Sequence, residues 1–439
     1  MKVLLLNPPG KRLYIRDYFC SMVAKGDYYT PPLDLLIQSG FLRDFEIKVI
    51  DAIAENLDDA ECTRRIMDFS PDAIYFLTGS VSWEEDRQFM RPFNDRITVA
   101  SGDNLDEKTL KDNPWLDAIL TDFTDDSLVS FLRGRPANNM ILRDKVTRMP
   151  GDFRIPVPRH ELFMGNYRYP FMTRKPMTSV LTSYGCPYSC RFCIVQTLKH
   201  RERPLANVKK ELEYVGKLGF RYIYFSDQTF SANRKRALLL CRELKKFSFE
   251  WCCFTRVDCV DPKLLSAMKE SGCNTIMFGV ESGDEAILKK YRKGYSHEDI
   301  RHAFALAKEH GIQTMGTFII GLPEDTEETI ESTIKLALGL GCDFASFNVA
   351  VPRKGTQLRE MALEKGLAQE HEPMDQGGTY ITMPTQTLGK ETVAQLRARA
   401  VRKFYFRPRY MINRITKIKS ITQLRTELSQ AIALVKQKV

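Results

Sequence analysis

Short apolar runs alternate with helix-length amphipathic segments along most of this 439-residue chain, and this alternation constrains its fold more than any other feature. Consecutive parallel strands need a crossover connection, which is usually a helix, so the pattern predicts parallel sheets covered by helices. The runs in the N-terminal part lie at residues 2–6, 46–52, 73–79, 96–102 and 117–122. We therefore expect residues 1–125 to form a doubly wound, Rossmann-like α/β domain.

Polar and small residues follow these runs. In doubly wound sheets, ligands bind beyond the carboxyl ends of the strands, so residues there are candidates for cofactor binding. The candidates are Asn7, Asp51, Thr78, Ser80, Ser101 and Gly102. Each of them, taken alone, could equally be a turn or cap residue.

The alternation pauses and then resumes. Residues 126–177 are rich in Pro and basic residues, which indicates a connector. Six further strand candidates lie at 178–183, 221–226, 251–257, 275–280, 314–320 and 345–351. With a helical segment in each gap, they predict a partial (βα)6 barrel of the TIM type over residues 178–370, with its chemistry at the carboxyl ends of the strands.

Residues 371–439 should form a C-terminal helical region, with helical patterns after Lys390 and again at 421–439. The net charge of +10 is concentrated here, since the segment from Arg397 onward holds 12 Lys or Arg and one acidic residue, Glu427. Aromatic residues alternate with the cations, which suits an acidic lipid surface or an anionic substrate, although a solvated basic face of a capping helix is an equal alternative. No RNA- or DNA-binding motif accompanies the charge, so a nucleic-acid partner is not expected.

The chain begins MKVLLLNPPG, and this apolar run is too short for a signal peptide or a membrane span. We also find no apolar stretch of membrane-spanning length elsewhere. The 11 cysteines lack the regular spacing of a disulfide scaffold, so we expect a cytoplasmic protein whose clustered cysteines bind metal.

The strongest chemical signal is TSYGCPYSCRFC, which places Cys186, Cys190 and Cys193 in one loop directly after the first barrel strand. Thiolates are the usual ligands of iron–sulfur clusters, and three of them leave one iron of a four-iron cluster open to another ligand. A zinc ribbon would need a second closely spaced cysteine pair, which the remaining cysteines do not provide.

This loop resembles the C-x3-C-x-aromatic-C motif of the radical S-adenosylmethionine (SAM) superfamily, with Phe192 at the aromatic position. The resemblance implies a [4Fe–4S] cluster on the three cysteines, with SAM bound at the free iron. It implies reductive cleavage of SAM to a 5′-deoxyadenosyl radical that abstracts a hydrogen atom from the substrate. A flavodoxin- or ferredoxin-type protein would supply the electron.

The segments GVESGDEAILKKYRKGYS and GIQTMGTFIIGLPEDTEETI resemble two further stretches of the superfamily. By position, Glu281 and Ser282 would contact the ribose or methionyl part of SAM, and Ile319 and Gly321 would line the adenine. Arg256 is a candidate partner for the SAM carboxylate, because a guanidinium pairs well with a carboxylate, or else a structural partner of the nearby Asp258.

A further pair, Asp227 and Gln228 in FSDQTF, stands where relatives carry a SAM-amine motif, and a strand-ending turn is the alternative. The histidines fall in linkers, loops and amphipathic helices, so they are not expected to be ligands.

The order of domains, with NPPG near the start and FYFRPRYMINRI near the end, resembles the cobalamin-binding branch of the superfamily, which includes carbon methylases and the anaerobic magnesium-protoporphyrin ester cyclase. The resemblance implies cobalamin as methyl donor. Thr78, Ser80, Ser101 and Gly102 are candidates for its contacts because they follow strands of the first domain. The chain departs from the branch at ASGDNLD and TDFTDDS, and it has no D-x-H-x-x-G motif, so no histidine is offered to cobalt.

The leading functional hypothesis is a cobalamin-dependent methyltransferase for an unactivated carbon of a small hydrophobic, lipid or tetrapyrrole-like substrate, with the basic tail at a membrane surface. One alternative is a radical SAM enzyme without cobalamin that performs hydroxylation, cyclisation or rearrangement. Another is a non-catalytic iron–sulfur or zinc protein that binds a partner through its tail.

Overall fold

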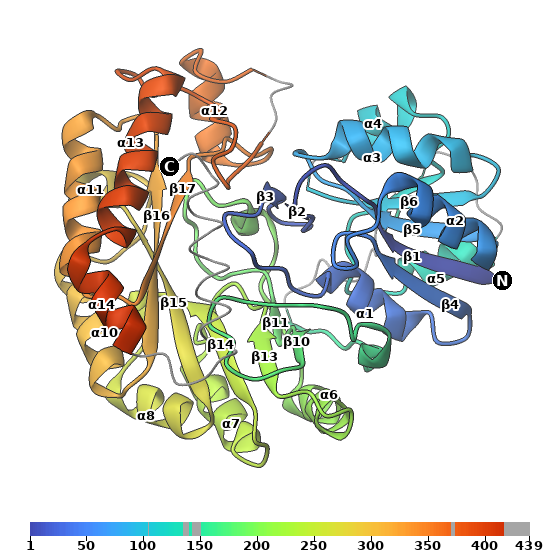
Figure 1. The fold of residues 1–439 in the computed structure, drawn as a ribbon, viewed down its shortest axis with the longest axis horizontal. Coiled ribbons are helices and arrows are strands. Elements are labelled where there is room, and N and C mark those ends of the chain that lie inside the picture. The colour runs from blue at the N-terminus through green and yellow to red at the C-terminus, as the bar shows by residue number, and fades with distance from the viewer. Residues whose placement is uncertain (104, 135–139, 143–150, 370–373, 417–439) are drawn as a thin grey trace. The chain divides into compact units, whose positions relative to one another are not determined.

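The computed structural model describes residues 1–103, 105–134, 140–142, 151–369 and 374–416 (Figure 1). The chain forms two compact units. The first unit comprises Met1–Ala24, Tyr29–Tyr167 and Arg201–Gly219, and the second comprises Lys25–Tyr28, Arg168–His200 and the residues from Phe220 onward. Each unit contains one six-stranded parallel sheet.

The sheet of the first unit has the strand order β4-β1-β5-β6-β7-β8, and its paired strands are parallel. The strands are β1 (Lys2–Asn7), β4 (Glu46–Asp51), β5 (Ala73–Leu77), β6 (Ile97–Ser101), β7 (Ala118–Leu120) and β8 (Met140–Leu142). The first five confirm the predicted strands. The order reverses between β1 and β5, so these two strands form the topological switch point of the sheet.

Helices cover both faces of this sheet, which confirms the doubly wound fold. One face packs against α2 (Asp59–Phe69), α3 (Trp83–Met90) and α4 (Glu107–Asp112) through apolar side chains such as Ile74 and Phe76. α1 (Leu33–Phe41) lies on the other face, where its Asp34 contacts Ser101. Strands covered on both faces read as continuous apolar runs, as β1 and β5 do.

The first unit does not end at residue 125, where we expected a connector to begin. α5 (Ser127–Arg133) follows that position, and β8 then adds a strand to the edge of the sheet. Two short pairs, β2 (Tyr14–Ile15) with β3 (Met22–Val23) and β9 (Gly151–Asp152) with β12 (Arg201–Glu202), were not predicted. α6 (Leu205–Lys217) also belongs to this unit, although it lies within the predicted barrel sequence.

The sheet of the second unit is an open, parallel six-stranded barrel sheet in chain order, as predicted. Its strands are β10 (Met177–Val180), β13 (Tyr222–Phe225), β14 (Glu250–Thr255), β15 (Cys273–Glu281), β16 (Gln313–Ile320) and β17 (Phe344–Val349). The short β11 (Ser183–Tyr184) follows β10 and leads into the cysteine loop.

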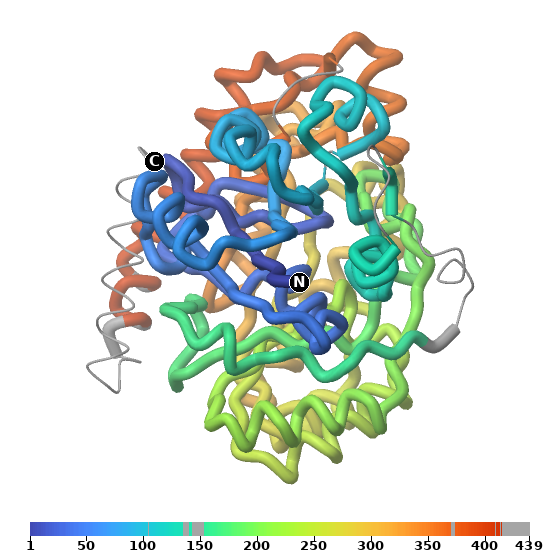
Figure 2. The backbone as a smooth tube through the Cα atoms, turned by 90° about the vertical axis from the view of Figure 1, so that its right-hand side faces the viewer, coloured from blue at the N-terminus to red at the C-terminus, as the bar shows by residue number. Residues whose placement is uncertain are grey.

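Helices lie along the outer face of this sheet (Figure 1). They are α7 (Arg234–Leu244), α8 (Pro262–Glu270), α10 (His297–Glu309), α11 (Glu327–Gly339) and α13 (Lys390–Tyr405). α9 (Glu285–Lys290) and α12 (Gln357–Glu364) instead pack in one apolar cluster with Phe192 and Ile319. α7 and α8 run side by side, in yellow-green in Figure 2. Four 3₁₀ turns, η1 (Arg91–Phe93), η2 (His160–Leu162), η3 (Ile194–Thr197) and η4 (Val257–Cys259), complete the helices described.

Alternate residues of the barrel strands face outward and inward. Phe318 of β16 stacks on Phe347 of β17, which in turn contacts Phe404 of α13, so these two positions face the outer helices. Along β16 every second residue is fully buried under the helices, while the alternate residues Met315, Thr317 and Ile319 are partly exposed. The inner face of the barrel is therefore the accessible one.

After α13 comes α14 (Pro408–Thr416), which confirms the helical pattern that follows Lys390. The second pattern that we predicted, at 421–439, lies outside the described residues. Within the described part of the chain, no helix combines the length and the apolar character that a membrane crossing requires.

Candidate functional site

The cysteine loop begins with a tight approach of two chain segments. Gly185 has a φ of +74°, and a Cβ placed there would lie 2.6 Å from the carbonyl oxygen of Lys199. The loop then turns so that Cys193 N–H donates to the carbonyl of Cys190 at 3.0 Å. Cys190 is buried and the other two motif cysteines are partly exposed. The loop therefore presents its thiols in a constrained, partly open turn.

Asp227 supports the start of this loop. Its carboxylate, at the end of β13, accepts hydrogen bonds from the backbone N–H groups of Thr182 at 2.6 Å and Ser183 at 3.0 Å. Arg236 donates to the Thr182 carbonyl at 2.9 Å. Burial raises the pKa of Asp227, and these hydrogen bonds and the charge of Arg236 oppose that shift. Asp227 therefore holds, through hydrogen bonds, the backbone segment that leads to the cysteines.

Gln228 adjoins the loop through its neighbour. Its backbone carbonyl accepts a hydrogen bond from Thr229 Oγ1 at 2.8 Å, and the same hydroxyl lies 3.5 Å from Cys186 Sγ.

Arg256 meets the loop from the end of β14. Its Nη1 donates to Cys190 Sγ at 3.7 Å, and its guanidinium lies 3.9 Å from the ring centroid of Tyr188. The same side chain pairs with Asp258 at 2.7 Å and donates to the Lys293 carbonyl at 2.5 Å. Arg256 therefore forms the structural ion pair with Asp258 that was the alternative prediction. It also contacts the cysteine loop.

Glu281 ends β15 in an unusual backbone conformation. Its φ is +71°, which is rare for a residue other than glycine, and the β15–β16 register shifts at this point. The carboxylate pairs with Lys293 Nζ at 3.0 Å, and both side chains are almost fully buried. Burial alone would lower the pKa of Lys293, but Glu281 raises it well above its ordinary value.

Lys293 was not predicted from the sequence. It lies 12 positions after Glu281 within a segment rich in lysine and arginine, and nothing in that segment distinguishes it from its exposed neighbours.

Apolar residues from three elements meet beside the loop. Phe192 and Ile319 pack against a common cluster that includes Ile287, Tyr291 and Leu322. The structure therefore brings the aromatic residue of the cysteine motif together with a residue that the resemblance assigns to adenine. An aromatic and aliphatic surface of this kind suits the flat face of a base.

The turn after β16 is held by a buried carboxylate. Asp325 accepts from the backbone N–H groups of Gly321 and Leu322, each at 2.9 Å. Gly321 has a φ of +88°, and a Cβ there would lie 2.8 Å from Val393 of α13. Ser282, also buried, accepts from the N–H of Asp284 at 3.1 Å.

Two cations determine the electrostatics of Cys190. Burial raises the pKa of its thiol, while the charges of Lys293 and Arg256 act in the opposite direction. Positive charge beside the loop favours thiolates and the anionic clusters that they hold. A four-iron cluster binds each thiolate to a different iron, so its ligands need not converge on one point. Among the described residues, no three His, Cys, Asp or Glu side chains converge in a way that could hold a single metal ion.

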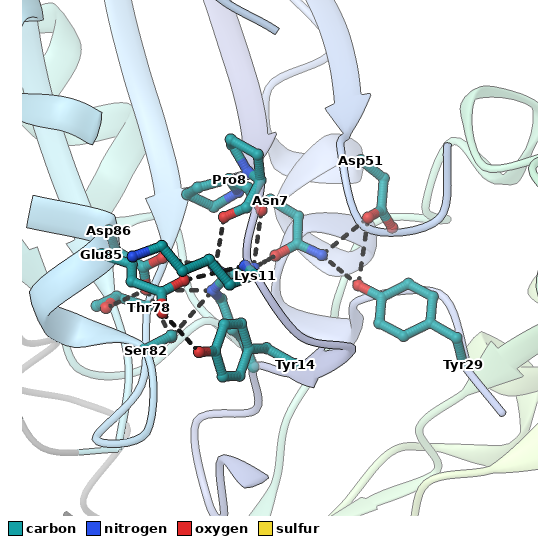
Figure 3. Close-up of polar contacts among 12 residues, drawn as sticks. Asn7, Pro8, Lys11, Tyr14, Tyr29, Asp51, Thr78, Ser82, Glu85 and Asp86 are labelled. Atoms are coloured by element: carbon teal, nitrogen blue, oxygen red, sulfur yellow. Dashed lines mark hydrogen bonds and ion pairs between the residues drawn. The ribbon is translucent and has the colours of Figure 1, made fainter. Parts of the chain in front are cut away.

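The first unit carries a second candidate region at the switch point of its sheet (Figure 3). Asn7, at the end of β1, donates to Asp51 Oδ1 at 2.8 Å and to the hydroxyl of Tyr29. The hydroxyl groups of Tyr29 and Tyr167 donate to Asp51 at 3.2 Å and 3.1 Å. Burial raises the pKa of Asp51 to about 6. The ends of β1 and β4 therefore carry a connected polar network. Asn7 and Asp51 lie at the ends of strands, which is where the sequence predicted them.

A buried ion pair lies beside this network. Arg16 Nη2 lies 2.5 Å from Asp86 Oδ1, and both side chains are fully buried. The guanidinium also donates to Asn7 Oδ1 and to the carbonyl of Pro8, both at 2.8 Å. The pair therefore fixes the NPPG turn, and no sequence pattern predicted this role for Arg16.

The predicted cofactor contacts of this unit lie at its strand ends, but their side chains have internal partners. Thr78 donates to Asp86 at 2.7 Å, and Ser101 donates to Asp34 at 3.1 Å. The backbone N–H of Ser80 donates to Asp103 at 2.9 Å. Gly102 lies so close to β5 that an added Cβ would be 2.6 Å from the carbonyl oxygen of Thr78.

Comparison with known proteins identifies the second unit's core. Residues 180–337 match the model of the family described as the radical SAM superfamily. These residues are a radical SAM domain. Such a domain binds a [4Fe–4S] cluster and SAM, and the cysteine loop and the residues around it lie within the matched range. The chain is therefore an enzyme of the radical SAM type.

Two relatives align over most of the chain. It is 29% identical to an uncharacterized methyltransferase of Pyrococcus horikoshii, over 94% of this chain and 95% of that protein. It is 26% identical to the anaerobic magnesium-protoporphyrin IX monomethyl ester cyclase of Rubrivivax gelatinosus, over 73% of this chain and 64% of the cyclase.

Two solved structures share the fold. The radical SAM methyltransferase TsrM of Kitasatospora setae, solved with cobalamin and a [4Fe–4S] cluster, superimposes with a TM-score of 0.69 and 14% identity over the full length of both chains. The cobalamin-dependent radical SAM enzyme OxsB superimposes with a TM-score of 0.66 and 16% identity, over 99% of this chain and 72% of OxsB. The likeness supports the Rossmann-like and barrel architecture of the two units.

Proposed function

We propose that this enzyme is a cobalamin-dependent methyltransferase that acts on an unactivated carbon. The proposal rests on one combination of features. The second unit has cations beside its cysteine loop, and the doubly wound first unit has polar side chains at its switch point. The full-length similarity to a methyltransferase and the fold shared with TsrM support it.

In this proposal Cys186, Cys190 and Cys193 hold the cluster, and SAM binds beside them. When bound, the cluster supplies the electron that cleaves SAM, and cobalamin supplies the methyl group. Arg256 and Lys293 provide positive charge next to the thiolates, and the buried Glu281 keeps Lys293 protonated. Protein groups thus bind and orient the reactants, while the cofactors perform the difficult steps.

Residues around SAM complete the site in this proposal. Ile319 and Phe192 offer an apolar surface to the adenine, and the turn at Gly321 and Asp325 keeps that surface in place. Asp227 positions the start of the cysteine loop through the backbone of residues 182 and 183.

A buried and unpaired acceptor on α1 supports a ligand site in the first unit. Gln38, fully buried on α1, donates to the carbonyls of Phe123 and Asp125 at 2.8 and 2.9 Å. Its Oε1 has no hydrogen-bond partner among the described residues. Native proteins pair almost all such buried groups, so an unpaired acceptor beside Ser101 and Asp34 is a place for a ligand donor. The internal pairing of Thr78 and Ser101 favours the alternative, a radical SAM enzyme without cobalamin.

Cobalamin binding separates these two functions. The full chain, reconstituted anaerobically with iron and sulfide, would be incubated with hydroxocobalamin and then desalted. The proposal predicts a stoichiometric amount of retained cobalamin, measured by its absorbance. Once a chemical reductant has converted the bound cobalamin to cob(I)alamin, a labelled methyl group should pass from SAM to cobalt with release of S-adenosylhomocysteine. Formation of 5′-deoxyadenosine without retained cobalamin would favour the alternative.

For the substrate we propose a hydrophobic or tetrapyrrole-like molecule. We also propose that a flavodoxin- or ferredoxin-type protein donates the electron that reduces the cluster. The inner face of β16 presents Met315 and Ile319, which are partly exposed and apolar. Apolar side chains on an accessible barrel face suit an apolar substrate.

We also propose that α14 contacts an anionic membrane surface. Phe406, Met411 and Ile412 are 49%, 49% and 61% exposed, and they adjoin the arginines of the same segment. Exposed apolar and basic residues together favour the lipid interface. The chain should float with vesicles that contain phosphatidylserine, and Ile412→Glu should reduce that binding several-fold. Equal binding to neutral vesicles, or no change in the variant, would contradict this role.

A further inference from the structure

Four residues of the N-terminal part of the chain belong to the second unit. The segment Lys25–Tyr28 lies apart from its sequence neighbours, which belong to the first unit. Tyr28 packs edge-to-face on Tyr169 with ring centroids 5.7 Å apart, and Asp27 forms an ion pair with Arg168. The segment is therefore packed into the barrel unit rather than loosely placed.

The side chain of Lys25 reaches the last barrel strand. Its Nζ donates to Ser346 Oγ at 2.6 Å and to Asn348 Oδ1, both on β17. Phe347, between these two residues, faces the outer helices, where it contacts Phe404. Because successive strand residues point to opposite faces, Ser346 and Asn348 face the inside of the barrel. Lys25 therefore presents its ammonium at the inner face.

This inner face is accessible. Ser346 and Lys25 are partly exposed, as are the inward residues of the neighbouring β16. In barrels of this type, substrates are bound at the carboxyl ends of the strands. Lys25 contacts the middle and the carboxyl-terminal part of β17 through Ser346, which is partly exposed, and Asn348, which is buried.

The hydrogen-bond partners of Lys25 do not neutralise its positive charge. Its two hydrogen-bond acceptors are neutral oxygens. The charges that act on it are those of Arg397 and Asp375. Arg397 donates to the carbonyls of Phe347 and Gly377, and Asp375 accepts from the backbone of Gly377 and Thr379. Among the residues that the structure describes, the group therefore contains two cations, Lys25 and Arg397, and one carboxylate, Asp375, and an anion would balance it.

We propose that Lys25 binds an oxyanion of the substrate, a carboxylate or a phosphate, at the inner face of β17. The assignment rests on the proposed function and narrows it, because it requires a substrate that carries an anionic group in addition to its apolar part. A tetrapyrrole-like molecule with carboxylate side chains meets this requirement, whereas a plain hydrocarbon does not.

The titration of Lys25 agrees with this geometry. The pKa of the amine is lowered to about 7, chiefly by burial and also by the charge of Arg397, while the charge of Asp375 acts in the opposite direction. Tyr28, which is also packed here, has its pKa raised by burial to about 12 and stays neutral. An oxyanion bound beside Lys25 would favour the ammonium form and raise its pKa.

Trace acetylation of the reconstituted full chain, read by mass spectrometry of the peptide that contains Lys25, tests the proposal. At pH 6, with inorganic phosphate or acetate as probe and chloride at equal ionic strength as reference, the probe should lower the labelling of Lys25. A rise of one pKa unit would lower it about tenfold, since the reactive free amine becomes that much rarer. Lys263, exposed on α8, should be labelled equally under all conditions.

The probes distinguish the two sources of the oxyanion. Protection by phosphate alone assigns a phosphate, and protection by acetate alone assigns a carboxylate. Unchanged labelling with both probes would overturn the proposal. As a second measurement, phosphate or acetate should raise the melting temperature of the wild type and of Lys263→Met but not that of Lys25→Met. Equal shifts in all three proteins would also overturn it.

The same samples separate this proposal from the proposed function. Formation of 5′-deoxyadenosine from SAM depends on the cysteine loop, whereas the labelling of Lys25 depends on neither SAM nor cobalamin. If the chain formed no 5′-deoxyadenosine but the anion probes still lowered the labelling of Lys25, the proposed function alone would be contradicted.

Discussion

At the scale of single residues, buried charges define the candidate site. Glu281 and Lys293 lie at 3.0 Å with side chains only 11% and 6% exposed. Such a pair adds little net stability, because desolvation offsets much of the attraction, but one partner left alone is costly. The pair therefore fixes the positive charge beside Cys190 instead of merely stabilising the fold.

Removing one partner of this pair should be more harmful than removing both. Lys293→Met leaves the Glu281 carboxylate buried and unpaired, and we expect it to lower the free energy of unfolding by about 3–5 kcal/mol. The double variant with Glu281→Gln should recover part of that loss. Denaturant titrations of the three proteins measure this, and a loss below about 1 kcal/mol for Lys293→Met would contradict the buried ion pair.

Asp51 should make stability depend on pH. Its pKa is raised from 3.8 to about 6 in the folded chain, so the folded state holds the proton more tightly than the unfolded state. The contribution of Asp51 is therefore most favourable below pH 4 and falls as the pH rises to 6, by about 3 kcal/mol in all.

The matched variant is Asp51→Asn, which cannot ionise. Relative to this variant, the wild type should lose stability between pH 4 and pH 6 and remain at a constant difference above that range. Urea titrations at several pH values measure the difference, and parallel curves for the two proteins would show that Asp51 is not perturbed.

At the scale of elements, the barrel and the first five strands of the N-terminal sheet were predictable, because each is a buried apolar run followed by a helix. The short strands were not. β8 has three residues, and β2 and β3 have two each, so none shows a period. α6 was predicted as a helix, but its membership of the first unit depends on buried long-range partners such as His160 and Glu211, 51 residues apart.

The site shows the same division. The cysteines, Arg256 and Glu281 follow from motifs and from their places at strand ends. Lys25, Arg16 and Lys293 are set by tertiary contacts, with partners 321, 70 and 12 positions away in sequence. No local pattern specifies contacts of this kind.

The turn after β16 allows a test of close packing at one glycine. Gly321 and Gly366 both have positive φ, at +88° and +66°, but an added Cβ meets Val393 only at Gly321 and meets nothing within 4 Å at Gly366. Gly366→Ala should cost about 1–2 kcal/mol for the backbone alone, and Gly321→Ala about 1–3 kcal/mol more.

Thermal or denaturant unfolding compares the two variants. Adding Val393→Ala to Gly321→Ala should remove most of the excess cost because the contact is relieved. Equal costs for the two glycine variants would mean that α13 does not approach this turn.

At the scale of the whole molecule, the chain crosses between the two units several times. Residues 201–219 belong to the first unit although they follow the cysteine loop. Glu211 of α6 is buried, pairs with Arg203 at 2.6 Å and contacts His160 at 3.0 Å. A segment that follows the cysteine loop in sequence therefore stabilises the first unit.

Glu211→Gln should loosen the first unit and leave the barrel strands unchanged. Hydrogen exchange read by mass spectrometry should be faster around residues 155–163, with no change in β14 to β17. Glu213→Gln, a change on the same helix at a side chain that is 47% exposed, is the matched control and should alter neither region. Faster exchange confined to the barrel would contradict the assignment of α6 to the first unit.

The direct test of radical SAM chemistry at the cysteine loop is reductive cleavage of SAM by the reconstituted full chain. With dithionite and SAM under anaerobic conditions, the wild type and a Cys20→Ala control should form 5′-deoxyadenosine, and Cys190→Ala, which removes the buried thiol beside Arg256, should form none. Undiminished 5′-deoxyadenosine from Cys190→Ala, or none from the iron-loaded wild type, would contradict the account.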